Sequence, residues 1–339
     1  MKRTIRLIST ILLFCCSLPI YSQKKIIIDC DPGVDDAMEV VLALQIPEIE
    51  IGGITIACND VNIGQRTKNT LRIVELSGKK IPVFVGAIRP LVVDPLPAGP
   101  NPIHGDDLLG NTNQPEPKIF AEQKTAAQFI VDIAKEYPGE ITILAEGRCT
   151  NLADAIRLDS NVTKNIKEVL VSGGTFHAGG LITPVAEPNI WFDPHAADMV
   201  FTAPWKVIEF GLDVNMKIVI SDSILLRVKN ENPKYGNFIY SITRLTRDFQ
   251  MKNLHTDGLI DPGSPLILYM VDSTLFKFTK APVRVVTEGL AIGQTIAPVY
   301  PFQFEDLAFK NKPLVSIATD VDIKRFLDYY QQIMLGKYH

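Results

Sequence analysis

The sequence is poor in the residue types that mark several protein classes. Only five of its 339 residues are cysteine. Three of them, Cys30, Cys58 and Cys149, lie after residue 22, and this small, odd number argues against a disulfide framework. No segment after residue 22 has 18 uninterrupted apolar residues, so we expect no membrane-spanning helix there. Lys and Arg, 34 together, do not exceed Asp and Glu, 38 together. A nucleic-acid surface needs a basic surplus, so we expect no nucleic-acid partner.

The first 22 residues differ from the rest of the chain. Lys2, Arg3 and Arg6 precede an apolar stretch over residues 7–20, and Ser22 is a small residue suited to cleavage. This pattern is typical of a secretory signal peptide. We therefore expect residues 1–22 to be removed and the protein to be exported, to the periplasm or the medium. Cys15 or Cys16 could instead carry a lipid, but the bulky Phe14 before them disfavours that alternative.

After residue 22, short apolar runs alternate with amphipathic stretches, which predicts an α/β fold with a mainly parallel open sheet and helices on both faces. With no linker and no repeat, we expect one domain over residues 23–339. Ligands of such sheets bind at the carboxyl ends of the strands. Strands are expected over residues 25–29, 49–57, 82–85, 141–145, 169–172, 207–210 and 283–287. Helices are expected over residues 35–45, 63–76, 124–137, 151–158, 220–229, 235–253 and 320–335.

Four carboxylates lie within eight residues at the end of the first predicted strand: Asp29, Asp31, Asp35 and Asp36. Carboxylates this close repel one another, and a hard cation such as Ca²⁺ or Mg²⁺ relieves the repulsion. Capping of the next helix would explain Asp35 and Asp36, but it leaves Asp29 and Asp31 unexplained. An Asp-x-Asp phosphatase is a third interpretation, which Gly33 disfavours.

The segment DCDPGVDDA, residues 29–37, resembles the N-terminal signature of the inosine–uridine-preferring nucleoside hydrolases. Further matching pieces occur in order along nearly the whole chain after residue 22. They are Asn59 and residues 103–105 (IHG), 150–151 (TN), 173–174 (GG), 185–189 (VAEPN), 193–194 (DP) and 261–262 (DP).

The resemblance implies a hydrolase that cleaves the N-glycosidic bond of ribonucleosides with a tightly bound Ca²⁺, through an oxocarbenium-like transition state. A nucleoside is then the small-molecule substrate, in purine or pyrimidine salvage, and the chain forms a homodimer or homotetramer. The implied residues have four roles. Asp31, Asp36 and Asp261 are side-chain ligands of Ca²⁺, Glu146 is a ligand through its backbone carbonyl, Asp35 is the general base, and Asn59, His104, Glu187 and Asn189 contact the substrate.

Three positions depart from the family pattern. Leu181 stands where members often have an Asn that contacts the ribose 5′-hydroxyl, and Ile260 stands where purine-accepting members often have a proton-donating His. Glu146 stands where many have Thr or Leu. His255 is a weak substitute for the missing acid. The losses at Leu181 and Ile260 keep a second hypothesis open, a non-catalytic Ca²⁺-dependent protein that binds nucleosides or sugars.

Overall fold

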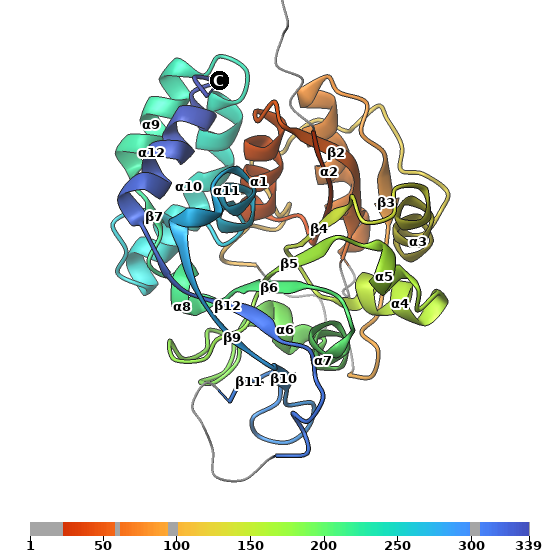
Figure 1. Cartoon of the computed structure of the whole chain (residues 1–339). Helices are drawn as coiled ribbons and strands as arrows, with labels where there is room; N and C mark the ends of the chain where they lie inside the picture. The colour runs from red at the N-terminus through yellow and green to blue at the C-terminus, as the bar shows by residue number, and fades with distance from the viewer. Residues whose placement is uncertain (1–22, 58–61, 94–100, 299–305, 339) are drawn as a thin grey trace, which may run out of the picture.

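The computed structural model describes residues 23–57, 62–93, 101–298 and 306–338 (Figure 1). Its central sheet has the strand order β3-β2-β1-β4-β5-β6-β12-β9. Neighbouring strands are parallel except for β9 and β12. The strands are β1 (Lys24–Cys30), β2 (Ile49–Ile56), β3 (Val83–Val85), β4 (Thr142–Ala145), β5 (Glu168–Ser172), β6 (Val207–Phe210), β9 (Phe276–Ala281) and β12 (Val315–Val321).

Two short antiparallel pairs lie outside this sheet: β7 (Val219–Ile220) with β8 (Leu259–Ile260), and β10 (Arg284–Val285) with β11 (Thr295–Ile296). The helices are α1 (Val34–Leu44), α2 (Ile63–Ser77), α3 (Ala126–Glu136), α4 (Thr150–Leu158), α5 (Val162–Asn165), α6 (Pro188–Phe192), α7 (Pro194–Thr202), α8 (Leu212–Asn215), α9 (Asp222–Glu231), α10 (Gly236–Asn253), α11 (Ser264–Val271) and α12 (Ile323–Met334). None of the helices in the described ranges is long and apolar enough to cross a bilayer.

Helices cover both faces of the sheet because the central strands are apolar on both sides. In β1, Ile26 and Ile28 belong to the core that contains α1, α10, α11 and α12, whereas Ile27 belongs to the core of α3, α4 and α7. All three are fully buried. Alternate residues of a strand point to opposite faces, so a continuous apolar run supplies both cores. The predicted fold class is therefore confirmed.

Some predicted boundaries were wrong. The helix predicted over residues 220–229 begins at Asp222, because Val219 and Ile220 pair with β8. The helix predicted over residues 320–335 begins at Ile323, where the carboxylate of Asp322 accepts a hydrogen bond from the backbone N–H of Arg325. Residues 320–321 end β12 instead.

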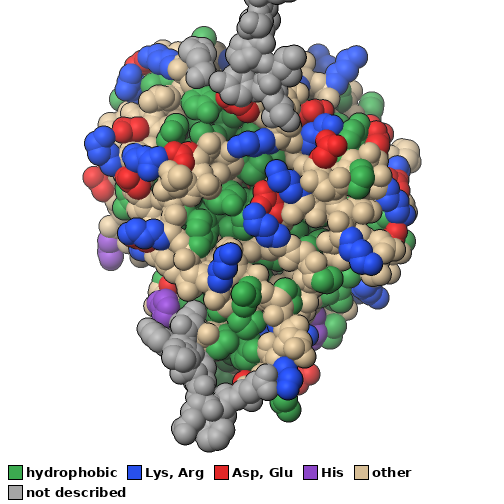
Figure 2. All heavy atoms as spheres, in the orientation of Figure 1, with side chains coloured by type: hydrophobic (Ala, Val, Ile, Leu, Met, Phe, Trp, Pro, Cys, Tyr) green, Lys and Arg blue, Asp and Glu red, His purple; other side chains and the backbone are tan. Residues whose placement is uncertain are grey.

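Two sequence predictions fall on parts of the chain that the structure does not describe. The predicted signal peptide, residues 1–22, is one, and Asn59 is the other. Of the three cysteines after residue 22, Cys30 and Cys149 are buried and free, and Cys58 lies outside the described residues. On the face shown in Figure 2, acidic and basic side chains are interspersed.

Candidate active site

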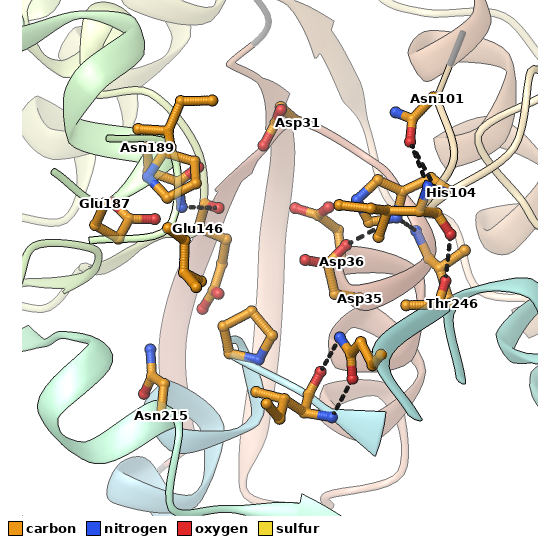
Figure 3. Close-up of a pocket in the computed structure, with 18 of the residues that line it drawn as sticks. Asp31, Asp35, Asp36, Asn101, His104, Glu146, Glu187, Asn189, Asn215 and Thr246 are labelled. Carbon is orange, nitrogen blue, oxygen red and sulfur yellow. Dashed lines mark hydrogen bonds and ion pairs between the residues drawn. The ribbon is translucent and has the colours of Figure 1, made fainter. Parts of the chain in front are cut away.

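A pocket of about 490 Å³ lies at the carboxyl ends of β1 and β4. Its lining comes from loops and helix termini far apart in the sequence, which converge on one space (Figure 3). This is where an open α/β sheet binds its ligands. The predicted site residues in the wall are Asp31, Asp35, Asp36, His104, Glu146, Glu187 and Asn189.

Asp261 lies behind the wall, between two residues that line the pocket, Ile260 and Pro262. It is fully buried. Burial and the charge of Asp35 raise its pKa to about 7. Asp261 in turn raises the pKa of Glu146, after larger contributions from burial, Glu39 and Asp36. The fold thus brings an acid from the C-terminal half beside the acids that follow β1.

The N-terminus of α1 positions two acids differently. The carboxylate of Asp36 accepts a hydrogen bond from the backbone N–H of Gly33, 2.8 Å from Oδ2. Capping therefore accounts for one oxygen of Asp36. The other, Oδ1, is buried without a hydrogen-bond partner in the described structure. The Asp35 side chain is 31% exposed, so it faces the pocket where a substrate can reach it.

Asp31 is held by two arginines. Its Oδ2 lies 2.5 Å from Nη1 of Arg148 and 3.3 Å from Nη1 of Arg66. Arg66 also donates to the backbone carbonyl of Asp31, and the Arg148 guanidinium lies 4.2 Å from the ring centre of Phe192. The two guanidinium groups thus compensate the charge of Asp31 within the protein.

A buried pair of glutamates lies beneath Asp36. Burial raises the pKa of Glu39 and of Glu146 well above the ordinary value. A methyl group added at Gly263 would stand 2.7 Å from Oε2 of Glu146 and 2.8 Å from Oε2 of Glu39. Both carboxyl groups therefore meet beside the turn that follows Asp261.

Glu187 and Asn189 present oxygens to the pocket from the start of α6. Oε2 of Glu187 accepts from the backbone N–H groups of Ile190 and Gly174, at 3.0 and 3.2 Å. Burial nevertheless raises the pKa of Glu187 to about 7. Nδ2 of Asn189 donates to the carbonyls of Glu146 and Ser172, at 3.0 and 3.1 Å. Both amide protons are thereby used, and Oδ1 remains as an acceptor.

His104 lies next to Asp35 on the opposite side of the pocket from Glu187 and Asn189 (Figure 3). Its Nδ1 accepts from the backbone N–H of Val34 at 3.3 Å and lies 3.7 Å from Oδ1 of Asp35. Thr246 of α10 donates to the carbonyl of Ile103 at 2.8 Å, which ties the His104 loop to α10. His255, the weak substitute for a leaving-group acid, is exposed and outside the pocket lining.

Sequence reasoning missed several residues of this site. Glu39 looked like one more residue of an amphipathic helix, although its apolar neighbours Met38, Val40 and Val41 were a signal that this turn is buried all round. The other missed residues each lie in a helix and outside the motifs recognised in the sequence: Arg66, Asn215, Thr246 and Gln250.

The donor set can be tested against a metal ion. No group of three or more His, Cys, Asp or Glu side chains in the described ranges is already arranged to hold one. The chemistry of the acids nevertheless fits a hard cation, because Asp36 Oδ1, Glu146 Oε1 and both oxygens of Asp261 are buried without hydrogen-bond partners in the described structure. Uncompensated buried carboxylates are costly, and oxygen-rich sites are those that Ca²⁺ and Mg²⁺ prefer.

Comparison with known proteins points to one family. A family model described as "Inosine-uridine preferring nucleoside hydrolase" matches residues 26–328. The chain is 35% identical over 311 residues to "Uridine nucleosidase 1" of Arabidopsis thaliana, covering 91% of this chain and 92% of the relative. It is 34% identical over 278 residues to "Inosine-uridine preferring nucleoside hydrolase" of Leishmania major, covering 80% and 87%.

Solved structures with a similar fold are also nucleoside hydrolases. A plant nucleoside hydrolase superposes with a TM-score of 0.88 at 28% identity, covering 92% of this chain and 99% of that one. A "Purine-Preferring Ribonucleoside Hydrolase from Gardnerella vaginalis" superposes with a TM-score of 0.82 at 29% identity, covering 93% and 99%. These matches set aside the Asp-x-Asp phosphatase interpretation. The chain belongs to the inosine-uridine preferring nucleoside hydrolase family, enzymes that hydrolyse the N-glycosidic bond of ribonucleosides and generally use a metal ion.

Proposed function

We propose that this chain hydrolyses ribonucleosides to ribose and free base with a bound Ca²⁺. The observation that carries the proposal is the contrast between Asp35 and its neighbours. Asp35 faces the pocket, whereas Asp36 and Asp261 behind it are buried with oxygens that lack hydrogen-bond partners in the described structure. A base at the surface above a cation site is the arrangement that metal-assisted hydrolysis needs.

The proposed ligands of Ca²⁺ are the side chains of Asp31, Asp36 and Asp261 and the backbone carbonyl of Glu146. When bound, the ion would orient a water molecule and lower the pKa of that water. The Glu146 carbonyl accepts one hydrogen bond from Asn189, and a carbonyl oxygen has a second lone pair for another partner. Asp31 would serve as a ligand while it remains paired with Arg66 and Arg148.

Asp35 is the proposed general base. It accepts a proton from the attacking water, with the His104 ring beside its carboxylate. Over the whole reaction the C1′–N bond breaks, the water oxygen bonds to C1′, and the base leaves with a proton on its nitrogen. Positive charge develops on the sugar in the transition state, and the acidic pocket favours that charge.

Glu187 and Asn189 are the proposed partners of the ribose hydroxyls. Oδ1 of Asn189 and the second oxygen of Glu187 are acceptors on the side of the pocket opposite Asp35 (Figure 3). A sugar held there presents its anomeric carbon toward Asp35. Asn59 is proposed as a third sugar contact from the resemblance alone.

The proposal is tested by incubating the purified protein with a panel of purine and pyrimidine ribonucleosides and Ca²⁺, and measuring released reducing sugar. Release that chelation abolishes and Ca²⁺ restores supports it. The second candidate, a non-catalytic binding protein, is favoured by Leu181 and Ile260, which cannot donate hydrogen bonds from their side chains. Calorimetric binding without any sugar release would support the binder and refute the hydrolase.

We further propose that residues 1–22 are a cleaved signal peptide, that the mature protein is periplasmic or secreted, and that it forms a homodimer or homotetramer in purine or pyrimidine salvage. N-terminal sequencing of the exported protein tests the first two points. Light scattering of the purified protein tests the third.

A further inference from the structure

One part of the pocket wall is apolar where a sugar-binding pocket would be polar. Leu181 and Ile182 line the pocket, and the two residues are 49% and 40% exposed. Solvent-exposed aliphatic side chains inside a pocket are a surface that an apolar part of a ligand can cover.

This wall is built by a tight turn. The backbone N–H groups of Leu181 and Ile182 both donate to the carbonyl of Ala186, at 3.1 and 3.2 Å, and Gly180 donates to the carbonyl of Pro184 at 3.0 Å. A side chain at Gly180 would overlap the backbone of Thr183 and Ala186. The turn therefore fixes the position of the two aliphatic residues relative to Ala186, the residue before Glu187.

Neither residue offers a hydrogen-bond donor to a ligand. Their side chains are apolar, and their backbone N–H groups are already bonded to Ala186. A hydroxyl packed against these side chains would lose its hydrogen bonds to water and gain none from them. A methyl or thioether group in the same place would instead be favoured by burial.

The position of the wall indicates which part of a nucleoside would meet it. Glu187 and Asn189 lie opposite Asp35 (Figure 3), so a sugar with C1′ toward Asp35 has its far edge toward the turn before Glu187. In ribose, the exocyclic C5′ projects from C4′, on the far side of the ring oxygen from C1′. The C5′ substituent is therefore the group nearest Leu181 and Ile182.

We propose that Leu181 and Ile182 form a subsite for an apolar C5′ substituent, so that the preferred substrates are 5′-deoxy or 5′-alkylthio ribonucleosides. The proposal rests on the proposed hydrolase function, whose sugar orientation it uses. It narrows the substrate class without specifying the base.

The test compares pairs that differ only at C5′: uridine with 5′-deoxyuridine, and adenosine with 5′-methylthioadenosine. We expect kcat/KM to be roughly tenfold or more higher for the apolar member of a cleaved pair. Leu181→Asn should lower the ratio of kcat/KM for the 5′-modified nucleoside to kcat/KM for the parent 5′-hydroxyl nucleoside by roughly tenfold. Leu226→Asn is the matched control, because Leu226 is 43% exposed on α9 and outside the pocket lining, and it should leave the ratio unchanged.

Preference for the parent nucleoside, or a ratio that Leu181→Asn does not move, overturns the subsite. Absence of cleavage from every pair refutes the hydrolase function instead. Calorimetric titration with the same pairs then decides the subsite: tighter binding of the 5′-modified member, weakened by Leu181→Asn, supports it, and equal or weaker binding overturns it.

Discussion

Glu209 in β6 is a buried acid that the proposed chemistry does not use. It is fully buried, and neither carboxylate oxygen has a hydrogen-bond partner among the described residues. Burial raises its pKa well above the ordinary value, and the charges of Asp213 and Glu187 add to the effect. The folded protein therefore keeps Glu209 protonated at pH values where the unfolded chain ionises it.

This difference makes folding stability depend on pH in a defined direction. Below pH 4.5, both states hold the proton and the contribution of Glu209 is constant. Above it, the folded state binds one proton more, so the free energy of unfolding falls by about 1.4 kcal/mol per pH unit until the folded-state pKa is reached. Glu209→Gln cannot titrate. The free energy of unfolding of the variant should therefore fall less steeply with rising pH than that of wild type, by about 1.4 kcal/mol per pH unit.

The measurement is urea unfolding of wild type and Glu209→Gln at pH 4, 5 and 6, followed by tryptophan fluorescence. Other buried acids titrate equally in both proteins, so the difference between the two curves isolates Glu209. We expect the free energy of unfolding of the variant, relative to wild type, to rise by about 1.4 kcal/mol between pH 5 and pH 6. A difference that stays constant across this interval would refute the reasoning, whatever the absolute stability of the amide variant.

Three further predictions concern the site and its support. Asp35→Asn should reduce kcat by roughly 100-fold or more, because it removes the proposed general base. Ca²⁺ binding, measured by calorimetry, should persist, because Asp35 is not a proposed ligand. Loss of Ca²⁺ binding together with kcat would contradict these separate roles. Asp261→Ala should weaken Ca²⁺ binding by roughly tenfold or more, measured by calorimetry; unchanged affinity would remove Asp261 from the ligand set. Gly110→Ala should lower stability by roughly 2 kcal/mol or more in urea unfolding, because Gly110 has φ +71° and a methyl group would overlap the carbonyl oxygen of Ile242. Gly139→Ala is the control, because Gly139 has φ +77° and no atom lies within 4 Å of the added methyl group. It should lower the free energy of unfolding by less than Gly110→Ala does, and an equal loss would refute the role of the overlap with Ile242.

The central strands could be predicted from sequence because their signal is simple. A strand buried on both faces is a short run of aliphatic residues, as in Ile26–Ile28, and its position depends little on the rest of the chain. The two strands at one end of the sheet, β12 and β9, were not predicted from sequence. In β9, KFTK lies between Phe276 and Ala281 and is exposed or half-buried, so only its pairing with β12 makes it a strand.

Five helices in the described part of the chain were not predicted from sequence: α5, α6, α7, α8 and α11. Two of them, α11 and α6, were missed for opposite reasons. In α11, the residues SPLILYMV are apolar all round, so no helical periodicity marks them. In α6, the sequence PNIWF follows Glu187 and looks like a loop, yet Pro188 suits the first helical turn and the Glu187 carboxylate caps it. The capping contact at the start of this helix also places Glu187 in the pocket.

The acids of the site show where a linear motif stops being informative. Residues 29–37 indicated a cluster of carboxylates, but not which of them keep uncompensated charge. The fold gives Asp31 two guanidinium partners, and it adds Glu39 to Asp36, Glu146 and Asp261 at the bottom of the pocket. Arg66 comes from α2 and Asp261 from the turn after β8, so neither relation can be deduced from residues 29–37 alone. Asp31 already has two guanidinium partners, whereas Asp36 Oδ1 and both oxygens of Asp261 lack hydrogen-bond partners among the described residues. A bound cation would therefore satisfy the deeper acids more than it would satisfy Asp31.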